Sequence, residues 1–165
     1  VEIHYSPKTS EEVIAITKAL MLKVGKKPIL VRKEIPGFIV NRIQAAVTRE
    51  ISYLINESVA SPEDIDMAAK ACYGLRWACI GSIEAMDMVG LDVVLGASRQ
   101  IFKTLSNSAE PSPILAEKVT RGELGVKSGR GWFDYKGKST AEILEDQNRR
   151  LLRQLALFKS LDEGI

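Results

Sequence analysis

The sequence predicts a mostly α protein in which a short strand–helix–strand unit precedes an all-helical domain. Residues 1–5 and 27–33 have the apolar, β-branched character of strands, and a helical pattern lies between them. From Pro36 onward, apolar residues recur at intervals of three and four, which is the spacing of amphipathic helices. We therefore divide the chain into two domains, residues 1–35 and 36–165.

The helix between the two strands is predicted to start at the stretch TSEE. There Thr9 can cap the helix and Glu12 can reach back to the Thr9 amide. Gly25 is predicted to end the helix. Strand, helix and strand over about 33 residues have the length of one βαβ unit. Only one such unit is present, whereas a parallel sheet normally has more than two strands and both faces covered.

Beyond Pro36 the pattern predicts about five helices. Caps and prolines at the first helical position mark their starts, and glycines mark their ends. The starts are Ser61 with Pro62, Ser112 with Pro113, and a capping box of Ser139 and Glu142. The predicted ranges are 38–58, 61–74, 82–105 with a break at Gly90, 111–125 and 139–161. The glycine-rich stretch 125–138 is predicted to be a loop.

The composition is that of an ordinary globular protein, with 45% apolar residues, 27% charged residues and a net charge of +2. Basic residues are spread among acidic ones, which argues against a nucleic-acid surface. No apolar run reaches the roughly 18 residues of a membrane span. Cys72, Cys79 and the single His4 make neither a disulfide framework nor a metal set. We therefore expect a cytoplasmic protein with no metal site and no nucleic-acid or membrane partner.

Two interpretations stay open for Arg76, which lies beside Trp77 in an apolar stretch. It could form an ion pair with Glu84 or Asp87, because an unpaired buried charge is costly. It could instead help to recognise an anionic ligand. The stretch SGRGW at 128–132 is no dinucleotide fingerprint, since it lacks a preceding strand and a third glycine in register. The residues alone therefore form no complete catalytic constellation.

Three blocks of the sequence resemble the signature blocks of the L-3-hydroxyacyl-CoA dehydrogenase family, in the same order and spacing. They are IPGFIVNRI (35–43), GLRWACIGSIEAMDMVGLD (74–92) and GELGVKSGRGWFDY (122–135). The family interconverts 3-hydroxyacyl-CoA and 3-ketoacyl-CoA with NAD. The resemblance implies a Rossmann-like domain that binds NAD, followed by an all-helical domain that forms most of a dimer interface and closes over the substrate. On this interpretation the chain is the last βαβ piece of the first domain and the whole of the second.

The resemblance also implies roles for three residues. Glu2 matches the catalytic Glu, which orients a general-base His that the family places upstream; His4 lies on the wrong side of Glu2 to match it. Asn41 matches the Asn of the P-G-F-x-x-N-R block, so its amide should contact the acyl thioester of the substrate. The alternative for Asn41 is a helix cap. Lys127 matches the Lys that reaches the NAD cofactor from the helical domain.

Taken together, the resemblance implies the C-terminal part of an NAD-dependent L-3-hydroxyacyl-CoA dehydrogenase of fatty-acid β-oxidation. NAD would bind mainly to the preceding domain, the substrate would be an acyl-CoA, and a homodimer would form through the apolar stripes of 38–58 and 82–105. Without the upstream His, the chain alone is expected to be inactive. The alternative is a helical dimerisation module of a related non-CoA dehydrogenase, of the lambda-crystallin or gulonate dehydrogenase type. The role of the helix at 139–161, the acyl chain length and fusion to an enoyl-CoA hydratase module stay open.

Overall fold

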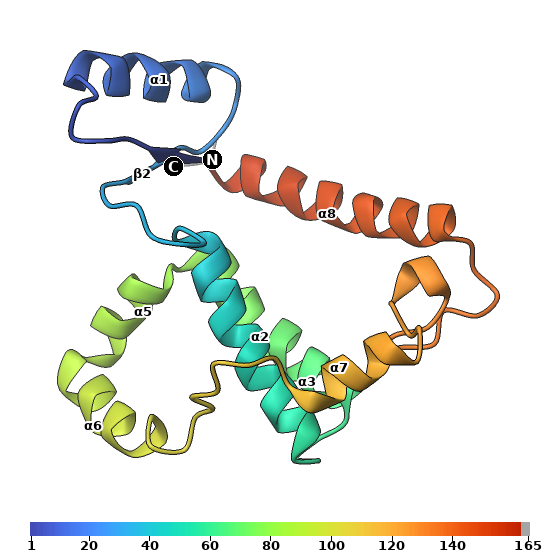
Figure 1. The fold of residues 1–165 in the computed structure, drawn as a ribbon. Helices are drawn as coiled ribbons and strands as arrows, with labels where there is room; N and C mark the ends of the chain where they lie inside the picture. The colour runs from blue at the N-terminus through green and yellow to red at the C-terminus, as the bar shows by residue number, and fades with distance from the viewer. Residues whose placement is uncertain (163–165) are drawn as a thin grey trace. The chain divides into compact units, whose positions relative to one another are not determined.

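The computed structural model describes residues 1–162 (Figure 1). It divides into two compact units, Val1–Ile51 and Ser52–Ile165, and the division falls inside helix α2 (Val40–Asn56). The domain boundary expected at residue 36 stays a prediction. The predicted fold class is confirmed, because the described elements are helices apart from one sheet of two strands.

The first unit contains the predicted strand–helix–strand arrangement. Strands β1 (Glu2–His4) and β2 (Ile29–Val31) pair in parallel, and helix α1 (Glu11–Lys23) connects them and lies along the pair (Figure 1). Ile3 and Val31 are the buried apolar side chains of the described residues. Since Glu2 pairs with Ile29 and His4 with Val31, the alternation along a strand puts Glu2, His4 and Val31 on one face and Ile3 on the other.

The start of α1 differs from the prediction. Ser10 is the N-cap, and its hydroxyl accepts a hydrogen bond from the Val13 amide at 3.3 Å. Thr9 instead belongs to the preceding turn, where its hydroxyl accepts from the Ser6 amide at 3.2 Å. Both residue types cap helices well, so the choice between them depends on this turn, which the local sequence pattern does not reveal.

The second unit and the end of the first contain seven α-helices among the described residues, more than the five or so predicted. After α2 come α3 (Pro62–Ala69), a π-helical turn η1 (Lys70–Gly74), α4 (Leu75–Cys79), α5 (Ser82–Val89), α6 (Leu91–Ile101), α7 (Pro113–Thr120), a 3₁₀ turn η2 (Val126–Ser128) and α8 (Thr140–Asp162). The predicted break at Gly90 is confirmed, and it separates two short helices in place of one long one.

Two of the three predicted helix starts are confirmed in detail. The Ser61 hydroxyl accepts from the Asp64 amide at 3.1 Å at the start of α3. At the start of α8, Glu142 accepts from the Ser139 amide at 2.7 Å, and Ser139 accepts from the Glu142 amide at 3.2 Å. Ser112 stands at the N-cap position of α7 as predicted, but its hydroxyl forms no cap and points to the Ser52 carbonyl oxygen at 3.4 Å.

The helix predicted to end at Gly74 continues through it to Cys79. Gly74 has helical dihedral angles, φ −62° and ψ −47°. A Cβ atom at this position would lie 2.7 Å from the Ala69 carbonyl oxygen, so only glycine lets that oxygen approach within the π-helical turn. Gly74 therefore permits a widened turn here and does not end the helix.

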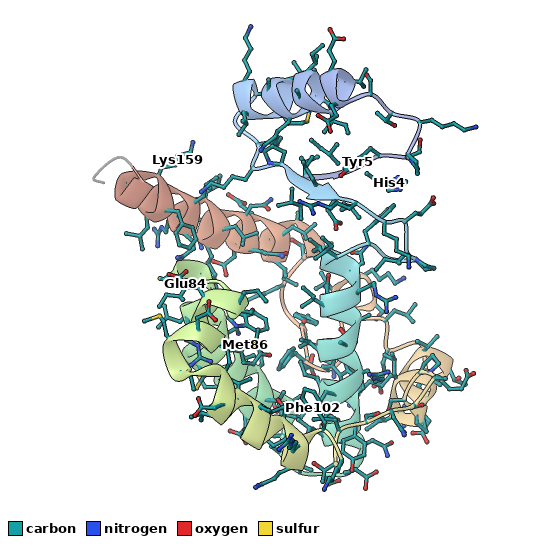
Figure 2. All side chains as sticks on the ribbon, turned by 90° about the vertical axis from the view of Figure 1, so that its left-hand side faces the viewer. His4, Tyr5, Glu84, Met86, Phe102 and Lys159 are labelled. Carbon is teal, nitrogen blue, oxygen red and sulfur yellow. The ribbon has the colours of Figure 1, made fainter. Side chains whose placement is uncertain are left out.

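The helices of the second unit bury little apolar surface against one another. The chain exposes 13,259 Å², whereas a compact monomer of 18.2 kDa exposes about 8,100 Å². Even two separate compact bodies of this total mass would expose only about 9,600 Å². Phe102, which follows the last residue of α6 and is labelled in Figure 2, is 69% exposed, and most apolar side chains of α5 and α6 are also exposed. Much of the apolar surface of these two helices is therefore uncovered in the described residues.

None of the described helices has the length and apolar character needed to cross a bilayer. The described residues also include no group of three or more His, Cys, Asp or Glu side chains arranged for a metal ion.

Candidate functional site

The carboxylate of Glu2 is bound at the start of helix α2. Its Oε1 accepts hydrogen bonds from the Ile39 amide at 2.8 Å and the Val40 amide at 3.2 Å. These amides belong to the first turn of the helix, where free N–H groups and the helix dipole favour an anion. The second oxygen, Oε2, accepts no hydrogen bond from the described residues. Glu2 is thus held by one oxygen and open at the other.

Asn41 is the second residue of α2, so it is not the N-cap. Its side chain is exposed and has no hydrogen-bond partner within residues 1–162. The Glu2 carboxylate provides the acceptor for the first amides of this helix in its place. The capping alternative for Asn41 is therefore wrong, and its amide is free to donate to and accept from a ligand. Glu2 and Asn41 are brought to the same helix start.

His4 follows Glu2 by two residues on the same face of β1. Its ring lies 5.4 Å from the Phe38 ring, centroid to centroid, with the planes tilted by 39°. Its Nε2 is 3.8 Å from Oε2 of Glu34. His4 is labelled in Figure 2. These contacts give it a packing role against the turn that precedes α2.

Lys127 is presented by an ordered loop in the second unit. Gly125 has φ 84° and ψ −144°, and a Cβ on Gly131 would lie 2.7 Å from the Gly125 Cα, so the two backbones are in close contact. The Ser128 hydroxyl accepts from the Leu124 amide at 2.8 Å and closes the loop. The predicted loop is confirmed, and it carries the short turn η2 on which Lys127 lies.

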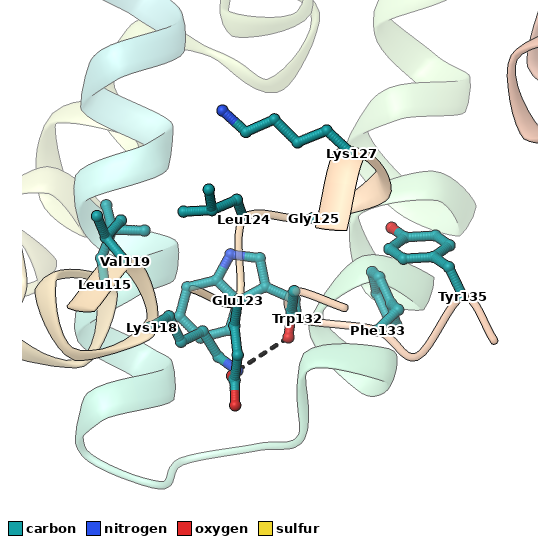
Figure 3. Close-up of a pocket in the computed structure, with 11 residues that line it drawn as sticks. Leu115, Lys118, Val119, Glu123, Leu124, Gly125, Lys127, Trp132, Phe133 and Tyr135 are labelled. Carbon is teal, nitrogen blue, oxygen red and sulfur yellow. Dashed lines mark hydrogen bonds and ion pairs between the residues drawn. The ribbon is translucent and has the colours of Figure 1, made fainter. Parts of the chain in front are cut away.

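A pocket of about 370 Å³ adjoins this loop (Figure 3). Its apolar walls come from α7, from the residue that precedes the glycine-rich loop, and from the aromatic residues of that loop. They are formed by Leu115, Val119, Leu124, Trp132, Phe133 and Tyr135. Lys127 extends along its edge (Figure 3). The Lys127 ammonium has no carboxylate partner within the described part of the chain. The pocket therefore combines aromatic walls with an unpaired cation.

The other cation of this pocket, Lys118, is fully engaged. Its ammonium donates to Glu123 Oε2 at 2.7 Å and to the Gly131 carbonyl oxygen at 2.9 Å, and lies 5.1 Å from the centre of the Trp132 ring. The side chains of Lys118 and Glu123 are each 17% exposed. Lys118 therefore ties α7 to the glycine-rich loop, and Lys127 remains the cation of this pocket that a ligand can reach.

The Lys118–Glu123 pair links folding stability to pH. The hydrogen bond from Lys118 is the main cause that lowers the pKa of Glu123 below its ordinary value, and the nearby Arg121 and Arg130 lower it further. In the unfolded chain the carboxyl returns to its ordinary value. A lowered pKa in the folded state therefore stabilises the fold at any pH above the ordinary pKa. This stabilisation is lost as the pH falls through the folded-state pKa.

We expect Lys118→Met to lower the urea midpoint at about pH 7 and to reduce the further fall of that midpoint as the pH drops below about 4.3, the ordinary pKa of a glutamate. The variant removes the main group that favours the charged Glu123. Urea titrations followed by circular dichroism at several pH values measure both effects. Lys103→Met, at an exposed position beyond the end of α6, is the matched control. An unchanged pH profile in Lys118→Met would contradict the assignment.

Of the two interpretations of Arg76, the ion pair with Glu84 or Asp87 is wrong. Residues 1–162 contain no pair of Arg76 with Glu84 or Asp87, and all three residues are exposed. Because the helix continues through Gly74, Arg76 lies in α4 on the surface and has no buried charge to compensate. The neighbouring Trp77 ring instead lies 5.0 Å from the Tyr73 ring.

Sequence patterns did not identify two features of these sites. The bond from Glu2 to the start of α2 joins residues 37 and 38 positions apart, and no local pattern links them. The Lys118–Glu123 pair lies closer together in sequence, yet it straddles the end of a helix, where the helical spacing of charges no longer applies. The family resemblance does indicate Glu2, Asn41 and Lys127, of which Lys127 belongs to the other compact unit.

Comparisons with known proteins agree with these features. Residues 37–135 match the family described as 3-hydroxyacyl-CoA dehydrogenase, C-terminal domain. The chain is 32% identical over 152 residues to 5-formyl-3-hydroxy-2-methylpyridine 4-carboxylate 5-dehydrogenase of Mesorhizobium japonicum, covering 92% of this chain and 49% of the relative. It is 36% identical over 141 residues to a probable 3-hydroxybutyryl-CoA dehydrogenase of Bacillus subtilis, a match that covers 85% of this chain and 48% of the relative. The chain thus spans about half the length of these relatives.

Two solved structures extend the comparison. A 5-formyl-3-hydroxy-2-methylpyridine 4-carboxylic acid 5-dehydrogenase, described as an NAD+ dependent dismutase, superposes with a TM-score of 0.87 over 98% of this chain and 51% of its own, at 32% identity. The (S)-3-hydroxybutyryl-CoA dehydrogenase of Ralstonia eutropha superposes with a TM-score of 0.55 and is 36% identical; the match covers 82% of this chain and 47% of the dehydrogenase. The predicted NAD dependence is thus confirmed within the family by the first of these structures. With its helical fold and the match over 37–135, this chain belongs to the 3-hydroxyacyl-CoA dehydrogenase family and contains its C-terminal domain.

Proposed function

We propose that this chain forms the C-terminal part of an NAD-dependent dehydrogenase that interconverts 3-hydroxyacyl-CoA and 3-ketoacyl-CoA, as in fatty-acid β-oxidation. The observation that carries the proposal is the Glu2 carboxylate, held at Oε1 by two amides and open at Oε2. A carboxylate held in this way suits the orientation of a general-base His, because the imidazole N–H needs one acceptor at a fixed position.

In the proposed reaction, a His from the preceding part of the enzyme takes the proton of the substrate 3-hydroxyl group. Oε2 of Glu2 accepts the N–H of that imidazole, which fixes the tautomer able to accept the proton and stabilises the imidazolium. The free amide of Asn41, at the same helix start, donates a hydrogen bond to the acyl carbonyl oxygen. Bound NAD supplies the hydride acceptor for this chemistry.

Lys127 fits an anionic group of the cofactor. Its ammonium has no carboxylate partner within residues 1–162, and a lysine at an exposed edge can meet a phosphate by charge-assisted hydrogen bonds. We assign it to a phosphate or ribose group of NAD, with most of the cofactor bound by the preceding domain.

A second candidate function is oxidation of a hydroxyl or aldehyde group on a substrate without CoA. The observation in its favour is the TM-score of 0.87 over 98% of the chain for the pyridine carboxylate dehydrogenase, against 0.55 over 82% for the 3-hydroxybutyryl-CoA dehydrogenase. A coverage of 98% has to include most of α8, so this relative has a counterpart of that helix. The lambda-crystallin homolog of mouse, 41% identical over 126 residues, agrees with a branch of this kind.

We further propose a homodimer formed through the helical domain, in the cytoplasm. The support is the exposed apolar surface of α5 and α6, where Ile83 is 71%, Met88 is 70% and Phe102 is 69% exposed. A cytoplasmic setting agrees with the two free cysteines, Cys72 and Cys79, both on the surface.

The chain by itself is expected to show no dehydrogenase activity, because within residues 1–162 no imidazole donates to Glu2. The test is NADH consumption with acetoacetyl-CoA, measured for this chain and for the full-length protein that carries it. The full-length protein should turn over at roughly 1–10³ s⁻¹, the ordinary range of enzymes. Formation of NADH from NAD in the presence of 5-formyl-3-hydroxy-2-methylpyridine 4-carboxylate tests the second candidate.

Turnover of acetoacetyl-CoA by the chain alone would contradict the proposal. A full-length protein that rejects CoA thioesters and oxidises the pyridine carboxylate would move the assignment to the second candidate.

A further inference from the structure

The turn between β2 and α2 has an unusual backbone. Gly37 has φ +81° and the following residue, Phe38, has φ +47°. Glycine adopts this left-handed conformation readily, whereas a residue with a Cβ and a large ring does so only when its surroundings impose it. The Phe38 amide donates to the Ile35 carbonyl oxygen at 3.0 Å, which closes the turn. Phe38 is therefore held in a conformation that it does not favour.

Contacts on both sides fix this turn. The Phe38 ring lies 5.4 Å from the His4 ring on strand β1. On the other side, Arg42 Nη1 donates to the Pro36 carbonyl oxygen at 3.3 Å, and the Arg42 Cγ would lie 3.3 Å from a Cβ on Gly37. The turn is thus attached to the strand by one aromatic contact and to the helix by one arginine.

The fixed turn aims two amides at one oxygen atom. Immediately after Phe38, the amides of Ile39 and Val40 both donate to Oε1 of Glu2. His4, which contacts Phe38, stands two residues from Glu2 on the same face of the strand. The ring contact and the two amide hydrogen bonds therefore both connect strand β1 to the turn before α2.

We infer that Phe38 is a positioning residue for the Glu2 carboxylate. Its ring, resting on His4, holds the left-handed turn in the form that directs the amides of Ile39 and Val40 at Oε1, and so sets the direction of Oε2. This inference rests on the proposed function, in which Oε2 receives the imidazole N–H of the catalytic His. Phe38 acts through Glu2 and has no direct part in the chemistry.

The first experiment reads the geometry without any activity. In ¹H–¹⁵N spectra of this chain, the Ile39 and Val40 amides should shift together as Glu2 ionises, because both donate to its oxygen. Glu2→Gln should abolish that shift, which separates it from titration of the neighbouring His4 and Glu34. Phe38→Ala should strongly reduce the shift, and Phe38→Tyr, which keeps the ring, should retain it.

Two further variants complete the set. His4→Ala removes the ring contact from the strand side, leaves Phe38 unchanged, and should reduce the amide shift as Phe38→Ala does. It keeps the test usable should Phe38→Ala fail to fold. Leu22→Ala, at a 55% exposed position on α1 of the same unit, is the matched control and should leave the shift unchanged.

The second experiment uses the full-length protein. Phe38→Ala should lower kcat by about 10- to 100-fold with little change in KM, since a small displacement of a catalytic group has effects of this size, and Phe38→Tyr should restore it. An amide shift and a kcat that both survive in Phe38→Ala and His4→Ala would overturn the inference. If the amide shift is lost in these variants while Glu2→Gln keeps full kcat, the positioning stands and the proposed catalytic role of Glu2 is wrong.

Discussion

Replacing Glu2 with Gln in the full-length protein is expected to lower kcat by about 10³- to 10⁴-fold with a small change in KM. The size follows from the loss of a carboxylate that orients and charges a general-base His, which costs about 10⁴ in comparable acid–base sites. Gln keeps an oxygen that can accept from the Ile39 and Val40 amides. Its amide nitrogen, however, donates where the imidazole N–H needs an acceptor, so the wrong tautomer is favoured.

The comparison of Gln with Ala separates two effects of Glu2. Glu2→Ala also leaves the first amides of α2 without their acceptor, so it should destabilise the fold by about 1 kcal/mol, the usual value of a helix cap. Glu2→Gln should retain most of that stability. Steady-state kinetics and thermal unfolding on the same preparations measure both quantities. Glu12→Gln, at an exposed position on α1, is the matched control for loss of a carboxylate.

The result that would reject the assignment is a Glu2→Gln enzyme within about tenfold of the wild-type kcat, because a factor that small lies below the 10² to 10⁴ expected of acid–base catalysis. In that case the two hydrogen bonds from the Ile39 and Val40 amides would still explain the position of Glu2, as a structural cap of α2. A drop in kcat that Glu2→Ala and Glu2→Gln share, with stability lost only in Glu2→Ala, would agree with both roles.

Local signals in the sequence predicted those parts of the fold that local chemistry decides. The start of α3 at Ser61 and Pro62, the capping box of α8 and the break at Gly90 each depend on residues within four positions of one another. The sequence reveals such elements because the donor, the acceptor and the restricted backbone all lie in one short window.

Features that depend on contacts beyond that four-residue window could not be predicted in this way. Gly74 looks like a helix end, but its missing Cβ makes room for the Ala69 carbonyl oxygen inside a π-helical turn. Phe38 shows no sign of a left-handed conformation, because that conformation depends on His4, which lies 34 residues earlier. The site residues Glu2, Asn41 and Lys127 were available only through a family resemblance. Only the structure shows which of these side chains form hydrogen bonds and which form none within residues 1–162.

Introducing charge on the helices α5 and α6 is expected to dissociate the proposed homodimer. These helices expose large apolar side chains, and the chain as a whole exposes about 3,600 Å² more than two compact bodies of its mass would. An obligate homodimer interface buries about 2,000–5,000 Å² in total, so each subunit has enough exposed surface for its half and for contact with a further domain. Such interfaces lose most of their affinity when central apolar anchors are replaced.

The variant that tests the dimer combines Met88→Glu with Phe102→Glu. Two anchors worth about 2 kcal/mol each would weaken association by about 10³-fold, and the buried charges would add to this. Light scattering coupled to gel filtration at micromolar concentration should show a dimer for the wild type and a monomer for the variant. Gln100→Glu adds one charge at an exposed position of α6 and serves as the control, which should remain dimeric. A wild-type chain that is monomeric at this concentration would contradict the dimer, and a dimeric double variant would move the interface away from α5 and α6.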